Sequence, residues 1–460
     1  MNENTNALAE MDKLPVSKAV LKNVLPAALI MLMSLVYNMA DKIFIGMANN
    51  DYMVAAVTLA MPVFVLFTSF GNIFGTGGVA LISRFTGEGN EKKSRQTASF
   101  CFWGAAIIGT VLLIILLIFK SGIISILGAT GKETISFTSD YLTYIAICCP
   151  FAILSQTISS LVRADGKPMQ SMIGMILGNV VNIVLDPVFI LAFDMGTKGA
   201  AIATLIGQLC SFGYYMFCIL SGKCNISIKP RDFTIKDKIA TSVFAIGTPA
   251  ALLSIFQSVC NIVTNNQIAC YGDIAVAGMG AAQNIVTIVG IFAIGIGTGI
   301  QPLLGYQLGT KNKKKFLNIF KFSMFLALGI CLVLTLLCFI FTEGIIGAFV
   351  ASGEAISIGV SFAKIILSTT WLYALFNVIA MSLQAMGQST TSLVVAMSRN
   401  CYIFIPVLLL MSKIGGMYGI VWAFPVSDVI CVVIAAAIFA FVVRKSFSQT
   451  NAAAVTPKEL

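Results

Sequence analysis

Three carboxylates lie inside long hydrophobic stretches of this chain, where a charged group is costly and is therefore a candidate for function. Asp41 and Asp186 fall in the first half of the sequence, and Asp428 falls near its end. Asp41 and Asp186 are each expected near the outer end of a membrane-spanning helix, at similar depth. Asp428 has no polar neighbourhood that the sequence identifies. The first two acids are therefore the leading candidates for chemistry.

Uncharged polar residues accompany Asp186 at helical spacing. Asn182 lies one turn before it, Asn179 continues that face, and Thr204 reaches a comparable depth in the following helix. Two nearby carboxylates in a medium of low dielectric disfavour double ionisation, so one is expected to hold a proton near neutral pH. Together with amide and hydroxyl oxygens, carboxylates could equally cage a Na⁺ ion. The cluster predicts a site for H⁺ or Na⁺.

A purely structural interpretation of these acids also stays open. Asp41 is followed by Lys42, which would either pair with it or extend to the membrane surface. Asp186 precedes Pro187 and would then cap a break in the helix.

The elements that must position these residues are transmembrane helices. Of the 460 residues 58% are hydrophobic and only 10% are charged, which is too apolar for a water-soluble domain. About twelve stretches are long enough to span a membrane, at roughly 19–47, 53–83, 96–119, 137–161, 169–194, 198–221, 239–268, 275–305, 316–341, 356–383, 391–413 and 418–443.

The sequence contains an internal repeat of two copies. Pro26 recurs as Pro249 and Asn38 as Asn261, each 223 residues later. Six spans in each copy leave both copies in the same orientation, so the repeat is parallel. We therefore expect an all-α integral membrane protein of twelve transmembrane helices, in two six-helix lobes related by a pseudo-two-fold axis along the membrane normal. The expected divisions are a first lobe at 1–222, a cytoplasmic linker at 223–238, a second lobe at 239–445 and a cytoplasmic tail at 446–460.

Charge gives the orientation and excludes several functions. Most of the 29 Lys and Arg residues fall in loops on one side, which places both termini in the cytoplasm of a multi-pass protein of the inner membrane. The net charge of +10 is scattered over these short loops, which is a poor pattern for binding nucleic acid. The chain has no nucleotide-binding loop and no His, so we expect no ATP, no cofactor and no metal beyond Na⁺. We expect a monomer.

The second copy lacks the acids of the first, because the residue aligned with Asp41 is Thr264. Ion coupling is therefore expected in the first half only. Pro26 and Pro249 each remove a backbone hydrogen bond inside the first helix of a copy, and the resulting kink is either static or linked to protonation. Uncharged polar residues that could line a substrate cavity, or simply bridge helices, are Asn38, Gln257, Asn261, Asn265 and Gln283.

Over nearly its full length the chain resembles the multidrug and toxic compound extrusion (MATE) transporters. The resemblance rests on VYNMADKIFIG around Asp41, GTGGVALISRFTGEGNEKKSRQ, LVRADGKP, NVVNIVLDPVFI around Asp186, and GTKGAAIATLIGQ around Thr204. It implies export of amphipathic, often cationic drugs or metabolites in exchange for H⁺ or Na⁺, by rocker-like movement of two lobes. It also implies that Asp41, Asn182, Asp186 and Thr204 form the cation network of the first lobe.

Two alternatives remain beside this resemblance. A flippase for a lipid-linked precursor needs a cationic central cavity, for which Lys364 and Arg399 are few. An integral membrane transferase needs acid-rich Mg²⁺ motifs, and the loops contain none. We therefore expect a transporter and not an enzyme.

Overall fold

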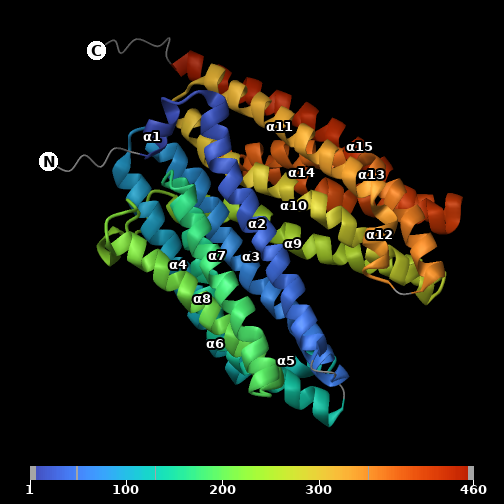
Figure 1. The fold of residues 1–460 in the computed structure, drawn as a ribbon. Coiled ribbons are helices and arrows are strands. Elements are labelled where there is room, and N and C mark those ends of the chain that lie inside the picture. Colours follow the sequence, from blue (N-terminus) through green and yellow to red (C-terminus); the bar gives the residue numbers. More distant parts are fainter. Residues whose placement is uncertain (1–6, 48–49, 130, 351, 454–460) are drawn as a thin grey trace, which may run out of the picture. The chain divides into compact units, whose positions relative to one another are not determined.

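The computed structural model describes residues 7–47, 50–129, 131–350 and 352–453, which are mostly helical and contain no strand (Figure 1). Eleven of its helical segments are long and apolar enough to cross a membrane. The last, Ser389–Phe447, has 59 residues, or about 90 Å of helix, roughly three times the thickness of a bilayer core. It is therefore long enough for two crossings, and the backbone leaves the helical conformation within it at Gly416 (φ 54°, ψ −135°). The expected helical membrane fold is confirmed, and the described residues agree with twelve crossings.

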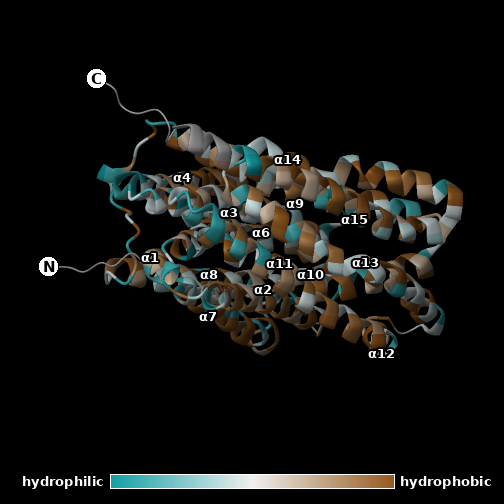
Figure 2. Cartoon of the chain, turned by 90° about the horizontal axis from the view of Figure 1, so that it is seen from above, coloured by the Kyte–Doolittle hydropathy of each residue, from teal (hydrophilic) through white to brown (hydrophobic). Residues whose placement is uncertain are grey.

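Hydrophobic residues run along most of the length of the long helices, as the brown ribbon in Figure 2 shows. Many large apolar side chains are exposed on them, including Ile118 at 70% and Phe325 at 73%. Such a surface is suited to lipid contact. The protein is thus a multi-pass membrane protein.

The chain divides into two compact units, which are described separately. Unit 1 takes the described residues of Met1–Lys13 and Leu29–Ala251. Its helices are α1 (Ala7–Asp12), the second part of α2 (Val16–Met47), α3 (Asp51–Gly87), α4 (Glu91–Ile118), α5 (Lys120–Ile126), α6 (Lys132–Ala164), α7 (Pro168–Pro187), the π-helix η1 (Val188–Ala192), α8 (Gly196–Leu220), the 3₁₀-helix η2 (Pro230–Asp232) and the first part of α9 (Ile239–Ala269).

Unit 2 takes Leu14–Ala28 and the described residues from Leu252 onward. Besides the remaining parts of α2 and α9, its helices are α10 (Asp273–Gly309), α11 (Lys313–Ile340), α12 (Thr342–Gly347), α13 (Gly353–Ala385), α14 (Ser389–Met397), the π-helix η3 (Ser398–Tyr402) and α15 (Phe404–Ala453). Helix α15 thus continues into the segment where we expected a tail.

The internal repeat is visible in the lengths and caps of corresponding helices. Helices α3 and α10 have 37 residues each, α4 and α11 have 28, and α6 and α13 have 33. The side chain of Asn90 caps α4 by accepting the N–H of Lys93, and Asn312 caps α11 by accepting the N–H of Lys315. The short helices α5 and α12 also begin 222 residues apart, at Lys120 and Thr342.

The first helix of each copy is divided between the units. Helix α2 passes from unit 2 to unit 1 after Ala28, and α9 passes from unit 1 to unit 2 after Ala251, in each case two residues beyond the proline. Glycines allow the close packing of these first parts. A Cβ added at Gly295 of α10 would lie 2.7 Å from the Cα of Ala28, and one added at Gly77 of α3 would lie still closer to the carbonyl oxygen of Val243.

Candidate functional site

The site is built where α7 and α8 of unit 1 pack backbone to backbone. A Cβ added at Gly178 of α7 would lie 2.6 Å from the carbonyl oxygen of Gly207 on α8, and the reverse contact is equally close. The hydroxyl of Ser211 donates to the Gly174 carbonyl at 2.9 Å, one turn further toward the N-terminus of α7. Small residues on both faces therefore hold the two helices together and bring their polar side chains within reach.

Asn182 joins the two helices at the centre of the cluster. Its Nδ2 lies 3.4 Å from Oδ1 of Asp186, one turn away on α7, and 3.3 Å from Oγ1 of Thr204 on α8. The Thr204 hydroxyl donates in turn to the carbonyl of Ala200 at 3.0 Å. All three side chains are buried, with Asp186 at 0% exposure. The predicted grouping of these residues is thus present in unit 1.

The cluster has buried polar atoms without hydrogen-bond partners among the described residues. These atoms are Oδ2 of Asp186, Oδ1 of Asn182 and Nδ2 of Asn179. A buried acceptor without a donor is costly, and the cost is removed when a proton or a metal cation binds there. Two oxygens of this kind on adjacent turns of α7 are suited to holding a cation.

Asp41 reaches the same region from α2. Its side chain is buried, at 9% exposure, and it lies within electrostatic range of Asp186. The hydroxyls of Tyr37 on α2 and Tyr141 on α6 lie in the field of both carboxylates. Sequence analysis missed these tyrosines, although Tyr37 precedes Asp41 by one helical turn, a spacing that could have identified it.

The chain does not break at the proline that follows Asp186. Helix α7 includes Pro187 and continues into η1, where the N–H of Phe193 bonds to the carbonyl of Val188 at 2.9 Å. Asp186 therefore lies inside a continuous helical segment and does not cap a break. Short π-helical segments of this kind are frequent at functional sites.

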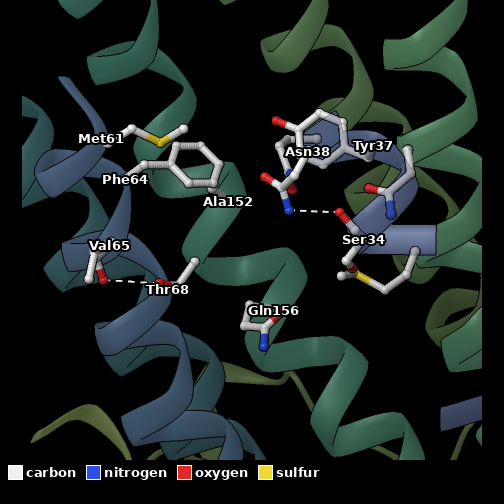
Figure 3. A pocket seen from close by; sticks show the side chains of 12 residues that line it. Ser34, Tyr37, Asn38, Met61, Phe64, Val65, Thr68, Ala152 and Gln156 are labelled. Carbon is white, nitrogen blue, oxygen red and sulfur yellow. Dashed lines mark hydrogen bonds between the residues drawn. The ribbon is translucent and has the colours of Figure 1, made fainter. Parts of the chain in front are cut away.

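A pocket of about 290 Å³ lies in unit 1 beside the carboxylate cluster, which consists of Asp41, Asn182, Asp186 and Thr204. Figure 3 shows Ser34, Tyr37 and Asn38 of α2 on one side of it and Met61 and Phe64 of α3 on the other. Its full lining is Ser34, Tyr37, Asn38, Met61, Phe64, Val65, Thr68, Ala152, Gln156, Met175, Asn179 and Gln208. The lining is mostly apolar, with a few amides and hydroxyls, as is typical of small-molecule sites.

The pocket adjoins the carboxylate cluster through Asn179 and Tyr37. Asn179 lines the pocket and continues the α7 face of the cluster, and Tyr37 lines the pocket within range of both carboxylates. In the pocket the amide of Asn38 donates to the Ser34 carbonyl at 2.7 Å, and Gln156 bonds to Asn72 at 3.1 Å. A molecule in the pocket would therefore contact a wall that adjoins the buried carboxylates.

Of the residues predicted to line a substrate cavity, Asn38 lines this pocket. The other four, Gln257, Asn261, Asn265 and Gln283, lie in unit 2, so their predicted role stays a prediction. Gln257 and Asn265 have exposed side chains, Asn261 is half-buried, and Nε2 of the half-buried Gln283 has no hydrogen-bond partner among the described residues.

Comparison with known proteins decides the family. The profile of the MatE family matches the chain twice, over residues 26–188 and 249–410, once in each copy of the repeat. The chain belongs to the MATE family. It is 30% identical to the multidrug export protein MepA of Staphylococcus aureus strain MSSA476. The similarity extends over 435 residues, which are 94% of this chain and 95% of that protein. MepA of Staphylococcus saprophyticus is 29% identical over 446 residues.

Solved MATE structures share the fold. A MATE family transporter solved in an outward-facing conformation superposes with a TM-score of 0.91 at 19% identity, over 97% of this chain and 99% of that one. Membership in the MATE family makes this chain a transporter of small molecules across membranes and not an enzyme, as its sequence predicted.

In this MATE chain Asp428 has a charged partner, contrary to what the sequence indicated. Nε of Arg399 lies 2.7 Å from Oδ1 of Asp428, and the two side chains are 16% and 3% exposed. The guanidinium also lies over the ring of Tyr373, 3.9 Å from its centroid. Sequence analysis missed the pair because the two residues are 29 positions apart, on η3 and α15. Among the described residues of unit 2, Asp428 is the only buried carboxylate in a span, and Arg399 neutralises it within that unit.

The structure gives less information on the remaining basic residues and on the two prolines singled out in the sequence. The side chain of Lys42 lies outside the described residues. The ammonium of Lys364 lies 5.7 Å from the ring centroid of Phe339. Pro26 and Pro249 both lie inside helices that continue through them, so the predicted kinks stay predictions.

Proposed function

We propose that this MATE protein is an antiporter that exports amphipathic, often cationic small molecules in exchange for inward-moving H⁺ or Na⁺. The observation that carries the proposal is the group of buried carboxylates beside a pocket in unit 1, with Oδ2 of Asp186 and Oδ1 of Asn182 lacking partners among the described residues. The relatives named multidrug export proteins support drug export over a flippase or a membrane transferase.

We expect that the coupling cation and a cationic cargo do not bind to unit 1 at the same time. With no cation bound, Asp41 and Asp186 are two acidic groups in a medium of low dielectric, and their negative potential favours a cationic molecule in the pocket. A bound H⁺ or Na⁺ neutralises this potential and satisfies the unpaired oxygens. The cation therefore favours release of the cargo. Tyr37 and Asn179 would connect the two events, because they line the pocket and also lie beside the carboxylates.

The cycle follows from this exclusion. In the outward-facing state the acids take up the cation and the cargo leaves. Rocker-like movement of the two lobes then exposes the site to the cytoplasm, where the cation leaves and new cargo enters. The first helices α2 and α9 would take part in this movement because each belongs to both units and contains a proline near the change of unit. We propose that the polar residues Gln257, Asn261, Asn265 and Gln283 of the second copy also contact the cargo during the cycle.

Orientation and coupling ion belong to the same proposal. The basic loops place both termini in the cytoplasm of the inner membrane. The oxygens of Asp41, Asn182, Asp186 and Thr204 serve either H⁺ or Na⁺, and no cofactor is required. We propose that the transporter acts as a monomer.

Substitution of the acids tests the proposal. Asp41→Asn and Asp186→Asn keep the shape of each side chain and remove its charge, so each should abolish energised efflux of a dye while leaving membrane abundance unchanged. The matched control is Asp140→Asn, because Asp140 lies in the same unit but pairs with Lys198 at 3.2 Å outside the cluster. Full efflux by both cluster variants would overturn the coupling claim.

A further inference from the structure

The segment that connects the two copies, residues 221–238, packs against helices of unit 1. The indole Nε1 of Trp103 donates to the carbonyl of Ile228 at 3.1 Å, and the hydroxyl of Ser99 donates to the carbonyl of Lys229 at 2.9 Å. Both donors lie on α4, one turn apart. The backbone of this connecting segment is therefore held at fixed positions on the helix.

Two further contacts extend this docking. The rings of Phe100 on α4 and Phe233 in the connecting segment stack with centroids 5.8 Å apart. The carboxylate of Asp165, at the end of α6, accepts the N–H of Asn225 at 2.8 Å. These hydrogen bonds and the ring contact anchor the connecting segment, so its side chains are held at defined positions.

A hollow of about 250 Å³ forms where the segment meets α4 and the end of α8. It is lined by Arg95, Ile219, Gly222, Cys224, Asn225, Ile226, Ser227, Lys229, Arg231 and Asp232. At about 30 Å³ per molecule, its volume equals that of about eight waters, which is ample for a hydrated phosphate.

The charge of the lining is unbalanced. Arg95, Lys229 and Arg231 bring three positive charges, and Asp232 brings one negative charge. Oδ2 of Asp232 is engaged by the hydroxyl of Ser227 at 2.5 Å, and no described residue forms a salt bridge with Asp232. The lining therefore carries a net charge of +2, from three cations and one carboxylate, and has a positive potential.

The hollow lies next to the membrane surface. The segment follows a span that ends at Leu220 and precedes one that begins at Ile239. Its basic residues are among those that predict the cytoplasmic side, where bilayers carry anionic lipids. Two guanidinium groups are suited to bidentate contact with phosphate oxygens, and an ammonium adds a point charge.

We propose that this hollow binds phosphate, as the headgroup of an anionic phospholipid at the cytoplasmic surface or as a soluble phosphate. Arg95 and Arg231 contact the phosphate oxygens, Lys229 adds its charge, and Asp232 limits the affinity by repulsion. The proposal does not depend on which ion drives export.

Binding measurements on the purified full-length protein test the proposal. In one arm, native mass spectrometry compares binding of phosphatidylglycerol with binding of phosphatidylcholine. In the other arm, calorimetry measures binding of inorganic phosphate. The double variant Arg95→Gln/Arg231→Gln should weaken binding at least about tenfold, and Asp232→Asn should strengthen it. The matched control is Lys92→Gln/Lys236→Gln, which removes two exposed charges from α4 and the connecting segment outside the hollow.

The arms distinguish the two sources of phosphate. Binding of phosphatidylglycerol that depends on Arg95 and Arg231 supports a lipid site. Binding of inorganic phosphate alone, with the same dependence, supports a site for a soluble phosphate. Equal losses in the two double variants would show diffuse surface charge and overturn the proposal, as would an unchanged affinity in Arg95→Gln/Arg231→Gln.

Discussion

At the scale of single residues, the two copies of this MATE chain differ in how their buried carboxylates are paired. In unit 1 the carboxylate of Asp186 receives one amide hydrogen from Asn182, and oxygens of both residues remain without donors among the described residues. In unit 2 the carboxylate of Asp428 is paired with Arg399. A bound cation would satisfy the first arrangement, whereas the second is already neutral.

Thr204→Val is expected to weaken transport. The substitution keeps the shape of the side chain and removes the oxygen that Asn182 contacts at 3.3 Å, which costs about 1 kcal/mol or more in the cation-bound state. Initial rates of dye efflux, normalised to membrane abundance, should fall about five- to tenfold. The control is Thr110→Val, whose exposed hydroxyl makes the same bond to the carbonyl four residues earlier. Equal rates in the two variants would exclude Thr204 from the cation site.

The buried pair in unit 2 is expected to be structural. Arg399→Met or Asp428→Leu alone leaves one buried charge without its partner, at a cost of about 3–5 kcal/mol, whereas the double variant removes both charges. Thermal unfolding in detergent should show the double variant to be more stable than either single variant, and it should still export dye. Strictly additive losses of stability would contradict the assignment.

At the scale of helices, the carboxylate cluster depends on the close approach of α7 and α8. Gly178 and Gly207 set the positions of Asn182 and Thr204. Because neither glycine has a side chain, the two helix backbones can approach closely at this contact. The sequence shows these glycines but does not show which of them face a neighbouring backbone. Gly213 on the same helix α8 has no atom within 4 Å of the place where a Cβ would lie.

Gly207→Ala and Gly213→Ala compare a glycine that faces a neighbouring backbone with one that faces open space. A methyl group at Gly207 would lie 2.6 Å from the carbonyl oxygen of Gly178 and 3.1 Å from Cβ of Asn182, so the helices must separate. We expect a loss of about 1–3 kcal/mol in stability and a strong loss of efflux, while Gly213→Ala should match the wild type. Unfolding temperatures and efflux rates measure both effects. Wild-type efflux by Gly207→Ala would show that the spacing is not critical.

The anchor of the connecting segment predicts a pH dependence of stability. Burial raises the pKa of Asp165 from 3.8 to about 6, although the N–H of Asn225 and the charge of Lys167 oppose the shift. The folded chain therefore holds a proton that the unfolded chain has released, so this group's contribution is lost as pH rises from 3.8 through about 6.

Asp165→Asn should remove that dependence. Relative to the wild type, the variant should gain stability between pH 4.5 and pH 7, by at most about 3 kcal/mol, because about 1.4 kcal/mol corresponds to each pKa unit. Asn keeps an oxygen that can accept the N–H of Asn225. Thermal unfolding in detergent across this pH range measures the difference. A difference that stays constant with pH would contradict the predicted pKa shift.

At the scale of the whole molecule, the sequence predicted what composition and repetition determine. Hydrophobic length gave the spans, the repeat gave the correspondence of the copies, and helical spacing grouped Asn182 with Asp186. Contacts between distant segments could not be predicted in this way. Tyr141 and the Arg399–Asp428 pair come together only through packing, and the division of α2 and α9 between two units depends on contacts that neither helix contains by itself.

We propose above that a cation held at Asp41, Asn182, Asp186 and Thr204 of unit 1 drives export. The most direct measurement is dye efflux from vesicles that contain the purified protein, with proton and sodium gradients imposed separately. The account predicts that one of the two gradients drives efflux by the wild type and by Asp140→Asn, and that neither gradient drives it in Asp186→Asn. Efflux by Asp186→Asn at the wild-type rate under the driving gradient would contradict the account.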